Sequence, residues 1–263
     1  MTEQVFRHNG IDMPYQQFGK GRTHIIWAHG WGHTGQNLLP LAKKLAKQAN
    51  HYVVDFPGFG KASLPPAAWG VEDYADYMSH FLKTLPEGKR IWVGHSFGCR
   101  VAIRLAAKNP KLLDGMVLIA AAGLKYRHNI FKKAYIKGRV YTYKALKKLA
   151  KWGVVSTEWL QKTFGSADYK NAQGPMRSVF VKVVNDDLAM VAPKVTCPVM
   201  LLFAEADTAT PPDFAYRYAR LMPRARAIVL GGLDHWTILT KGEHQVTHRI
   251  QRFITDMDKE LSS

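Results

Sequence analysis

The sequence predicts an α/β fold, with a mostly parallel sheet flanked by helices and an inserted helical segment. Short apolar runs without alternation recur along the chain, residues 116–120 being one of them, and helical patterns separate these runs. Such runs are typical of parallel strands that are buried on both faces. The alternation stops at Gly123 and resumes at Pro198, which indicates an insertion. The 263 residues, 47% of them hydrophobic, suffice for one large domain of this kind.

The part of the chain before Gly123 begins with a predicted hairpin. Asn9-Gly10 separates two apolar runs there, and this dipeptide is the strongest short-range hairpin signal. The helices are predicted from apolar residues at helical spacing, such as Leu38, Leu41 and Leu45. In chain order we expect the hairpin over 4–18, strands over 24–28, 51–56, 90–93 and 116–120, and between these strands helices over 36–48, over 72–85 and through Val101 to Ala106.

The part after Gly123 begins with the insertion. Residues 124–190 have mostly helical patterns and no convincing strand. The alternation then returns with a strand over 198–203, a helix over 213–221, a strand over 227–230 and a helix over 243–260. We therefore predict one α/β core formed by residues 1–123 and 191–263, with residues 124–190 as a helical cap.

The charge and the cysteines restrict the environment of the protein. A net charge of +17 favours contact with an acidic partner, although a basic solubilising surface would produce the same count. Cys99 and Cys197 are too few for a disulfide framework and lack the spacing of a zinc site. The N-terminus shows no secretory pattern, and no apolar run is long enough for a spanning helix. A cytoplasmic protein is the simplest expectation, and a periplasmic one that has lost its leader is the alternative.

The candidate nucleophile is Ser96, in the segment Gly94-His95-Ser96-Phe97-Gly98. This segment matches the G-x-S-x-G pattern of a nucleophile elbow, in which a serine at a strained strand-to-helix turn projects its oxygen above the sheet. The pattern is short, so it also occurs by chance in unrelated sequences. Here it follows an apolar strand and opens a helix, which is the context that the chemistry requires.

A serine hydroxyl needs a base to take its proton and an acid to orient that base. His235 follows the last predicted strand and is the candidate base. Asp207 follows the strand over 198–203 and is the candidate acid, because functional groups of open α/β sheets gather at the carboxyl ends of strands. Glu205 and Asp234 are weaker alternatives for the acid, and a plain turn-forming role for Asp207 is the other reading.

The developing oxyanion would need hydrogen-bond donors. The loop His29-Gly30-Trp31-Gly32 follows the first long strand, where a second donor is expected. We therefore expect the backbone N–H groups of Trp31 and Phe97 to donate hydrogen bonds to the oxyanion. The alternative is that this loop only shapes a tight turn. Chemistry of this kind calls for no metal ion and no organic cofactor.

These segments together resemble the α/β-hydrolase superfamily, and the likeness extends over nearly the whole chain. The segment 55–63 resembles the D-x-P-G-x-G-x-S turn common in that superfamily. Within it the chain is similar to serine carboxylesterases with a helical cap, such as the pimeloyl carrier-protein methyl esterases. The resemblance implies hydrolysis of carboxylic esters through an acyl-enzyme, and the aromatic and apolar residues of the predicted cap favour an apolar acyl or alcohol group. A carbon–carbon bond hydrolase or perhydrolase with the same triad, and a ligand-binding protein on the same fold, are the alternatives.

The predicted cap concentrates the positive charge. Residues 124–190 contain 14 Lys and Arg against 4 Asp and Glu, a net of +10. The hypothesis is that this surface docks an acidic carrier protein or an anionic membrane surface, and the alternative is a solvated face. Nucleic acid is less favoured, since no binding motif accompanies the charge. The lysines predicted to share one helical face are Lys133, Lys137, Lys144, Lys148 and Lys151, and the first four of them are predicted to form the docking site.

Overall fold

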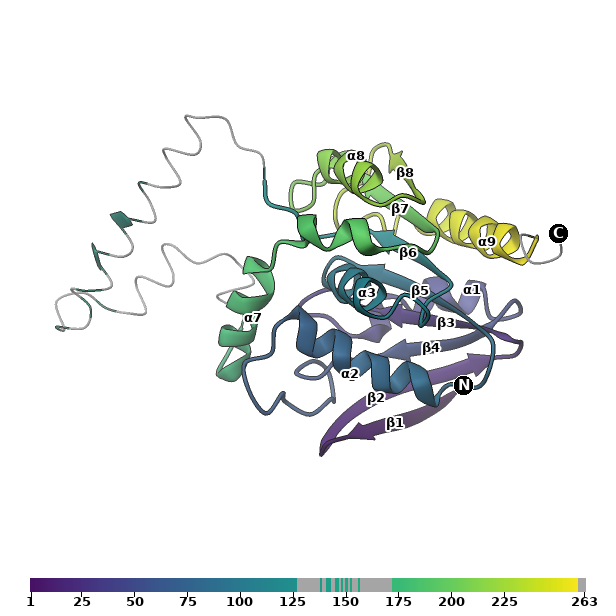
Figure 1. Ribbon diagram of the computed structural model, residues 1–263, viewed down its shortest axis with the longest axis horizontal. Helices are drawn as coiled ribbons and strands as arrows, with labels where there is room; N and C mark the ends of the chain where they lie inside the picture. The colour runs from purple at the N-terminus through teal and green to yellow at the C-terminus, as the bar shows by residue number, and fades with distance from the viewer. Residues whose placement is uncertain are drawn as a thin grey trace.

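One eight-stranded sheet forms the centre of the molecule in the computed structural model (Figure 1). The structure describes residues 1–126 and 172–259, together with positions 138, 141, 142, 145, 146, 148, 150, 152 and 156. The order of the strands is β1-β2-β4-β3-β5-β6-β7-β8. Their bounds are β1 Thr2–His8, β2 Ile11–Gly19, β3 Thr23–Ala28, β4 Asn50–Val54, β5 Lys89–His95, β6 Gly115–Ile119, β7 Val199–Ala204 and β8 Ala225–Leu230.

The strand directions agree with a mostly parallel sheet. β1 and β2 form the predicted hairpin, and β2 is also antiparallel to β4, whereas every pair from β4–β3 to β7–β8 is parallel. At the hairpin turn Asn9 and Gly10 have φ angles of 50° and 74°. Two positive φ angles in succession define the type I′ turn that matches the twist of the flanking strands. The predicted fold class is therefore confirmed.

Helices cover both faces of this sheet. The α-helices with described bounds are α1 Leu39–Lys44, α2 Val71–Thr84, α3 Phe97–Lys108, α7 Pro175–Asn185, α8 Pro212–Leu221 and α9 Glu243–Lys259. In β5, Trp92 packs into the core under α2, α3 and α8, whereas Ile91 and Val93 pack into the core under α1 and α9. The alternation of side chains along a strand thus gives each face its own apolar core. None of the helices described is long and apolar enough to cross a lipid bilayer.

The prediction of one helix over 36–48 was wrong in its extent. The structure has a short 3₁₀ turn at Gly35–Asn37 and then α1 at Leu39–Lys44. A continuous helix would need a hydrogen bond from the backbone nitrogen of Pro40 to the carbonyl of Gln36, and proline has no N–H to donate. At the other end, the chain continues in tighter turns, in which the N–H of Ala46 donates to the carbonyl of Lys43 and that of Gln48 to the carbonyl of Leu45, each three residues back.

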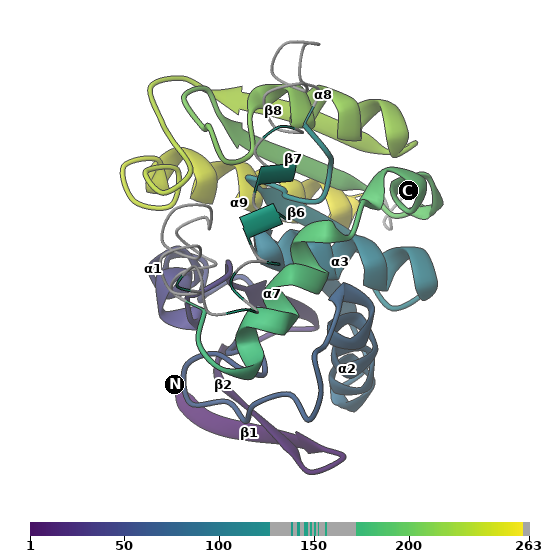
Figure 2. The ribbon, with the colours of Figure 1, turned by 90° about the vertical axis from the view of Figure 1, so that its left-hand side faces the viewer.

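Between β6 and β7 the chain leaves the sheet. Of this part, α7 lies in front of α2 and α3 in the view of Figure 2. One face of α7 is buried, formed by Met176, Val179, Phe180 and Val183. The ring of Phe180 lies 5.1 Å from that of Trp31, between ring centroids, so α7 packs against the loop that follows β3. The division into a core and a cap over 124–190 stays a prediction.

Candidate active site

Ser96 is held in a strained conformation between β5 and α3. Its φ is +48° and its ψ is −100°, and a non-glycine residue in such a region costs about 1–3 kcal/mol. A Cβ atom on Gly98 would lie 2.2 Å from the carbonyl oxygen of Ala28, and one on Gly94 would lie 2.9 Å from the carbonyl carbon of Gly98. The two glycines of the motif therefore allow α3 to start directly against β3 and β5, which is how the turn at Ser96 becomes so sharp.

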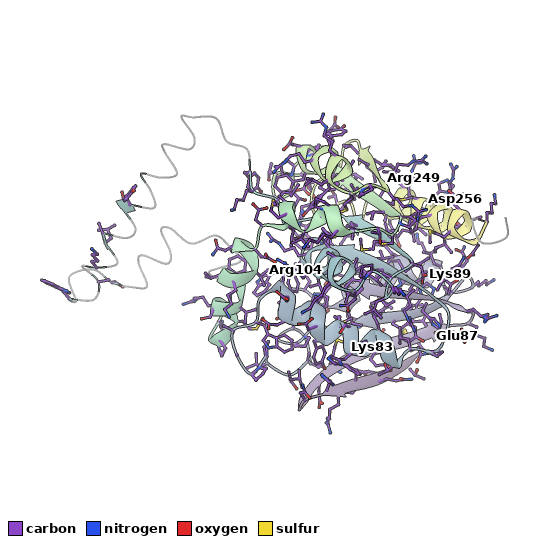
Figure 3. All side chains as sticks on the ribbon, in the orientation of Figure 1. Lys83, Glu87, Lys89, Arg104, Arg249 and Asp256 are labelled. Carbon is purple, nitrogen blue, oxygen red and sulfur yellow. The ribbon has the colours of Figure 1, made fainter. Side chains whose placement is uncertain are left out.

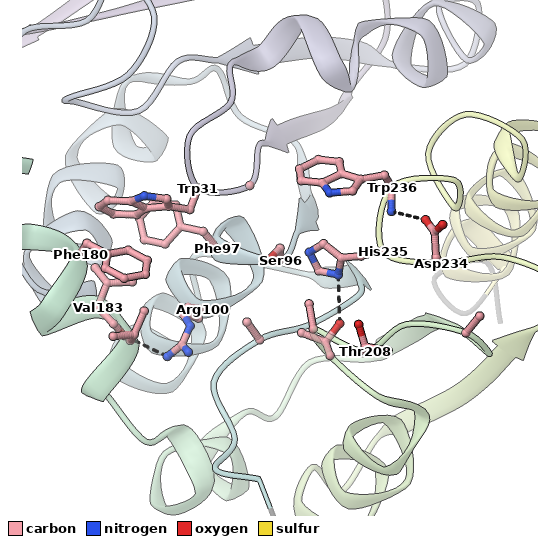
Figure 4. Close-up of a pocket in the computed structure, with 16 residues that line it drawn as sticks. Trp31, Ser96, Phe97, Arg100, Phe180, Val183, Thr208, Asp234, His235 and Trp236 are labelled. Carbon is pink, nitrogen blue, oxygen red and sulfur yellow. Dashed lines mark hydrogen bonds between the residues drawn. The ribbon is translucent and has the colours of Figure 1, made fainter. Parts of the chain in front are cut away.

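His235 and Asp207 come from two loops that meet beside Ser96. Asp207 follows β7, and His235 lies in the loop between β8 and α9. His235 Nδ1 is 2.7 Å from Asp207 Oδ2, and the carboxylate is fully buried. Figure 4 shows Ser96 next to the imidazole of His235. Because Nδ1 is engaged by the carboxylate, Nε2 is the nitrogen left for the serine.

The carboxylate of Asp207 accepts several further hydrogen bonds. The backbone N–H groups of Ala209 and Thr210 each donate to Oδ1 at 2.8 Å, and the hydroxyl of Thr210 donates to Oδ2 at 2.7 Å. Burial by itself would raise the pKa of Asp207, but hydrogen bonds from His235 and from Thr210 outweigh it and hold the pKa below its ordinary value. Asp207 is therefore ionised at neutral pH and favours the tautomer of His235 that carries a proton on Nδ1.

Two other histidines contribute to the shape of the site. Burial, and secondarily the neighbouring His235, lower the pKa of His95 to about 3, and its Nε2 lies 3.1 Å from the carbonyl oxygen of His235. Burial lowers the pKa of His29 to about 4. His29 Nε2 accepts a hydrogen bond of 3.0 Å from the N–H of Phe56, and its Nδ1 lies 2.7 Å from the carbonyl oxygen of Gly30. Both rings are neutral, and they hold the loops that carry Trp31 and His235.

The backbone N–H groups of Trp31 and Phe97 are available as donors. Phe97 is the first residue of α3, where N–H groups have no partner within the helix. Neither N–H has an acceptor among the residues that the structure describes. A helix N-terminus also attracts negative charge, so this is a favourable position for an oxyanion.

These groups open into a cleft of about 580 Å³ (Figure 4). Most of its described lining is apolar or small. The side chains that matter for the argument are Trp31, Phe97, Phe180 and Val183 on the apolar side, and Ser96, Arg100 and His235 on the polar side. Arg100 and Thr210 were missed by the sequence reasoning. Arg100 lies in the first turn of α3, and no signal in the sequence distinguishes it, because its acceptors Val183 and Asp186 are more than 80 residues away.

The two alternative acids make other hydrogen bonds, although Asp234 also lines the cleft. Glu205 is exposed and accepts a hydrogen bond of 3.2 Å from the N–H of Gly232, and Asp234 accepts the N–H groups of Trp236 and Thr237. Of the predicted docking lysines, Lys148 is helical and exposed. The other three, Lys133, Lys137 and Lys144, lie outside the described residues.

A model described as the alpha/beta hydrolase family matches residues 25–247. The chain belongs to this family. The match covers every strand from β4 to β8 and includes Ser96, Asp207 and His235.

Relatives of this α/β hydrolase include a "Pimeloyl-[acyl-carrier protein] methyl ester esterase" from Proteus mirabilis (strain HI4320). The two are 32% identical over 108 residues, which are 41% of this chain and 40% of the relative. A protein of the same name from Citrobacter koseri (strain ATCC BAA-895 / CDC 4225-83 / SGSC4696) is 29% identical over 111 residues, which are 42% of this chain and 41% of the relative. The matched part thus spans about two fifths of the length of these relatives.

Among solved structures, a bacterial membrane phospholipase A superimposes with a TM-score of 0.76 at 20% identity. That superposition covers 98% of this chain and 86% of the phospholipase. The enol-lactonase from Burkholderia xenovorans LB400 gives a TM-score of 0.73 at 18% identity over 96% of this chain and all of the lactonase. At these identities the likeness shows the fold alone.

Proposed function

We propose that this α/β hydrolase cleaves carboxylic esters through an acyl-enzyme formed on Ser96. The observation that supports the proposal most directly is the 2.7 Å contact between His235 Nδ1 and Asp207 Oδ2 beside a serine with positive φ. The names of the relatives, which are methyl ester esterases, agree with this class of reaction.

The proposed reaction has two steps. Ser96 Oγ attacks the ester carbonyl while His235 Nε2 takes its proton, and the N–H groups of Trp31 and Phe97 stabilise the oxyanion. His235 then gives the proton to the departing alcohol. A water molecule, activated by the same imidazole, releases the acid. The apolar lining from Trp31, Phe97, Phe180 and Val183 favours an apolar part of the substrate near the serine.

The decisive test is covalent labelling with a fluorophosphonate, run beside p-nitrophenyl esters of increasing chain length. We expect one label per chain, located on Ser96 by peptide mass spectrometry, and steady turnover of the esters. Ser96→Ala is the matched control and should take no label. Folded wild-type protein that neither takes the label nor turns over any ester would exclude the proposal. Turnover of a dienone or peroxide-dependent turnover in place of ester cleavage would favour the carbon–carbon bond hydrolase or the perhydrolase.

The predicted cap over 124–190 is proposed to recruit the substrate by charge. The docking lysines are the four named above, of which Lys148 is exposed in the structure. An acidic carrier protein is the partner favoured, because the relatives are named for an acyl-carrier protein ester. Association between a basic and an acidic surface is mainly an effect on the encounter rate, so it weakens with salt.

Reversing the charge of Lys133, Lys137, Lys144 and Lys148 to Glu should lower kcat/KM for a carrier-linked ester at low salt by about tenfold or more. Turnover of a small p-nitrophenyl ester should stay the same, since a neutral small molecule is not steered by charge. The matched control reverses four exposed lysines of the core, namely Lys20, Lys47, Lys83 and Lys111. If both quadruple variants behave alike, or if neither changes the carrier reaction, docking through these lysines is wrong. A rate that depends instead on vesicles of anionic lipid would assign the surface to a membrane.

A further inference from the structure

Arg100 is a cationic side chain inside the cleft that the proposed ester hydrolysis does not use. It lies in the first turn of α3, four residues after Ser96. Its side chain lines the same cleft as Ser96, and among the described lining residues no other Lys or Arg is present. Figure 4 shows Arg100 between Ser96 and Val183 of α7.

The hydrogen bonds of Arg100 leave part of its guanidinium group without an acceptor. Nη1 donates to the carbonyl oxygens of Val183 at 2.9 Å and of Asp186 at 2.8 Å, at the carboxyl end of α7. Nε and Nη2 have no acceptor among the described residues, neither of them is fully buried, and Arg100 lines the cleft. A guanidinium group offers five N–H donors in a rigid fork, so the side facing the cleft can still bind a carboxylate.

The charge of Arg100 is only partly offset by its surroundings, since the carboxylates of Asp186 and Asp187 raise its pKa by less than burial lowers it. Asp186 is paired with Arg104, one turn further along α3, and Asp187 lies 3.3 Å from Lys125 Nζ. Arg100 makes no ion pair within the part of the chain that the structure describes. Burial lowers the pKa of Arg100, which expresses the cost of holding a charge in this place. An anion in the cleft would offset that cost.

The geometry of the reaction decides which part of a substrate reaches Arg100. The departing alcohol must receive its proton from His235, so the alcohol part lies on the side of His235. Arg100 and the aromatic residues Trp31, Phe97 and Phe180 lie on the other side of Ser96 (Figure 4). The acyl part of the substrate therefore extends toward Arg100, with its methylene groups against the aromatic side chains.

We infer that Arg100 is a specificity-determining residue that binds a carboxylate at the far end of the acyl chain. The substrates it selects are half-esters of dicarboxylic acids, in preference to simple alkyl esters, whereas an acyl chain whose far end is linked to a carrier protein would not use this site. The inference rests on the proposed ester hydrolysis and adds the chemical class of its acyl group.

The test compares substrates on one preparation of protein. For the wild type, kcat/KM for monomethyl adipate should exceed that for methyl hexanoate and that for dimethyl adipate, which has the same chain and no charge. In Arg100→Met this preference should fall by about ten- to hundredfold, the usual contribution of a hydrogen-bonded charge. Arg100→Lys keeps the charge but loses the fork, and should retain part of the preference.

Arg104 (labelled in Figure 3) is unsuitable as a control, because its loss would free the carboxylate of Asp186 next to Arg100. Lys108→Met is the matched control. It removes a positive charge from the same helix and breaks an ion pair with Glu72, but Lys108 is not among the described lining of the cleft. Its preference for the half-ester should equal that of the wild type. If Arg100 only anchors α7, Arg100→Met lowers the rates of charged and neutral esters together and leaves their ratio unchanged, which would overturn the inference.

The wild-type measurement does not depend on the stability of any variant. A wild type that cleaves methyl hexanoate at least as well as monomethyl adipate would refute the role of Arg100 while leaving ester hydrolysis intact. If none of the three esters is turned over and Ser96 takes no label, the proposed function itself is refuted.

Discussion

Replacing Asp207 with Asn should lower kcat by about ten-thousandfold, the size of effect expected when the base is held in the wrong tautomer. The orientation of the new amide is determined by its surroundings. The N–H groups of Ala209 and Thr210 both point at Oδ1, so the amide oxygen must occupy that position. The amide nitrogen then faces His235 Nδ1 and donates a hydrogen bond to it. In the wild type the direction is the reverse, since Asp207 Oδ2 accepts a hydrogen bond from Nδ1.

The consequence for His235 follows directly. With Nδ1 as an acceptor, the proton of the neutral ring lies on Nε2, and Nε2 can no longer take the proton of Ser96. The measurement is kcat for a p-nitrophenyl ester, with thermal unfolding to verify the fold. Glu205→Gln is the control, since Glu205 is the alternative acid and accepts only an exposed N–H, and the activity of this variant should stay within about twofold of the wild type. Comparable losses in both variants would contradict the assignment of Asp207.

Much of the fold and of the candidate site could be predicted because the signals are local. Ser96 directly follows β5, Asp207 and His235 lie in the loops after β7 and β8, and parallel strands bring their carboxyl ends to one edge of the sheet. The order along the chain then selected His235 among 11 histidines. Asn9-Gly10 located the hairpin in the same way, from two residues.

What could not be predicted depends on contacts between distant segments. Arg100 reads as an ordinary polar position of α3, because its acceptors Val183 and Asp186 are more than 80 residues away in the sequence. The broken helix before β4 shows a different limit. The apolar spacing of Leu38, Leu41 and Leu45 is helical, and all three are buried as that spacing predicts, but the missing N–H of Pro40 decided where the helix begins.

Gly98→Ala should damage both stability and activity, although it adds a single methyl group. The new Cβ would lie 2.2 Å from the carbonyl oxygen and 2.7 Å from the carbonyl carbon of Ala28. These are backbone atoms in the middle of the sheet, so no side chain can rotate away to make room. Relief requires the start of α3 to move away from β3, at a cost of about 1–3 kcal/mol or more in the free energy of unfolding.

That movement would act on the chemistry as well. Gly98 donates its N–H to the carbonyl oxygen of His29 at 3.1 Å, and the neighbouring Phe97 N–H is a proposed oxyanion donor. A shift of about 1 Å in a reacting group costs on the order of a hundredfold in rate. Gly70→Ala is the matched control, since its nearest contact would be 3.8 Å and its φ is −98°. Chemical denaturation and kcat, measured on both variants, test the argument. A Gly98→Ala protein with the stability and rate of Gly70→Ala would mean that close packing of α3 on β3 does not determine the geometry at Ser96.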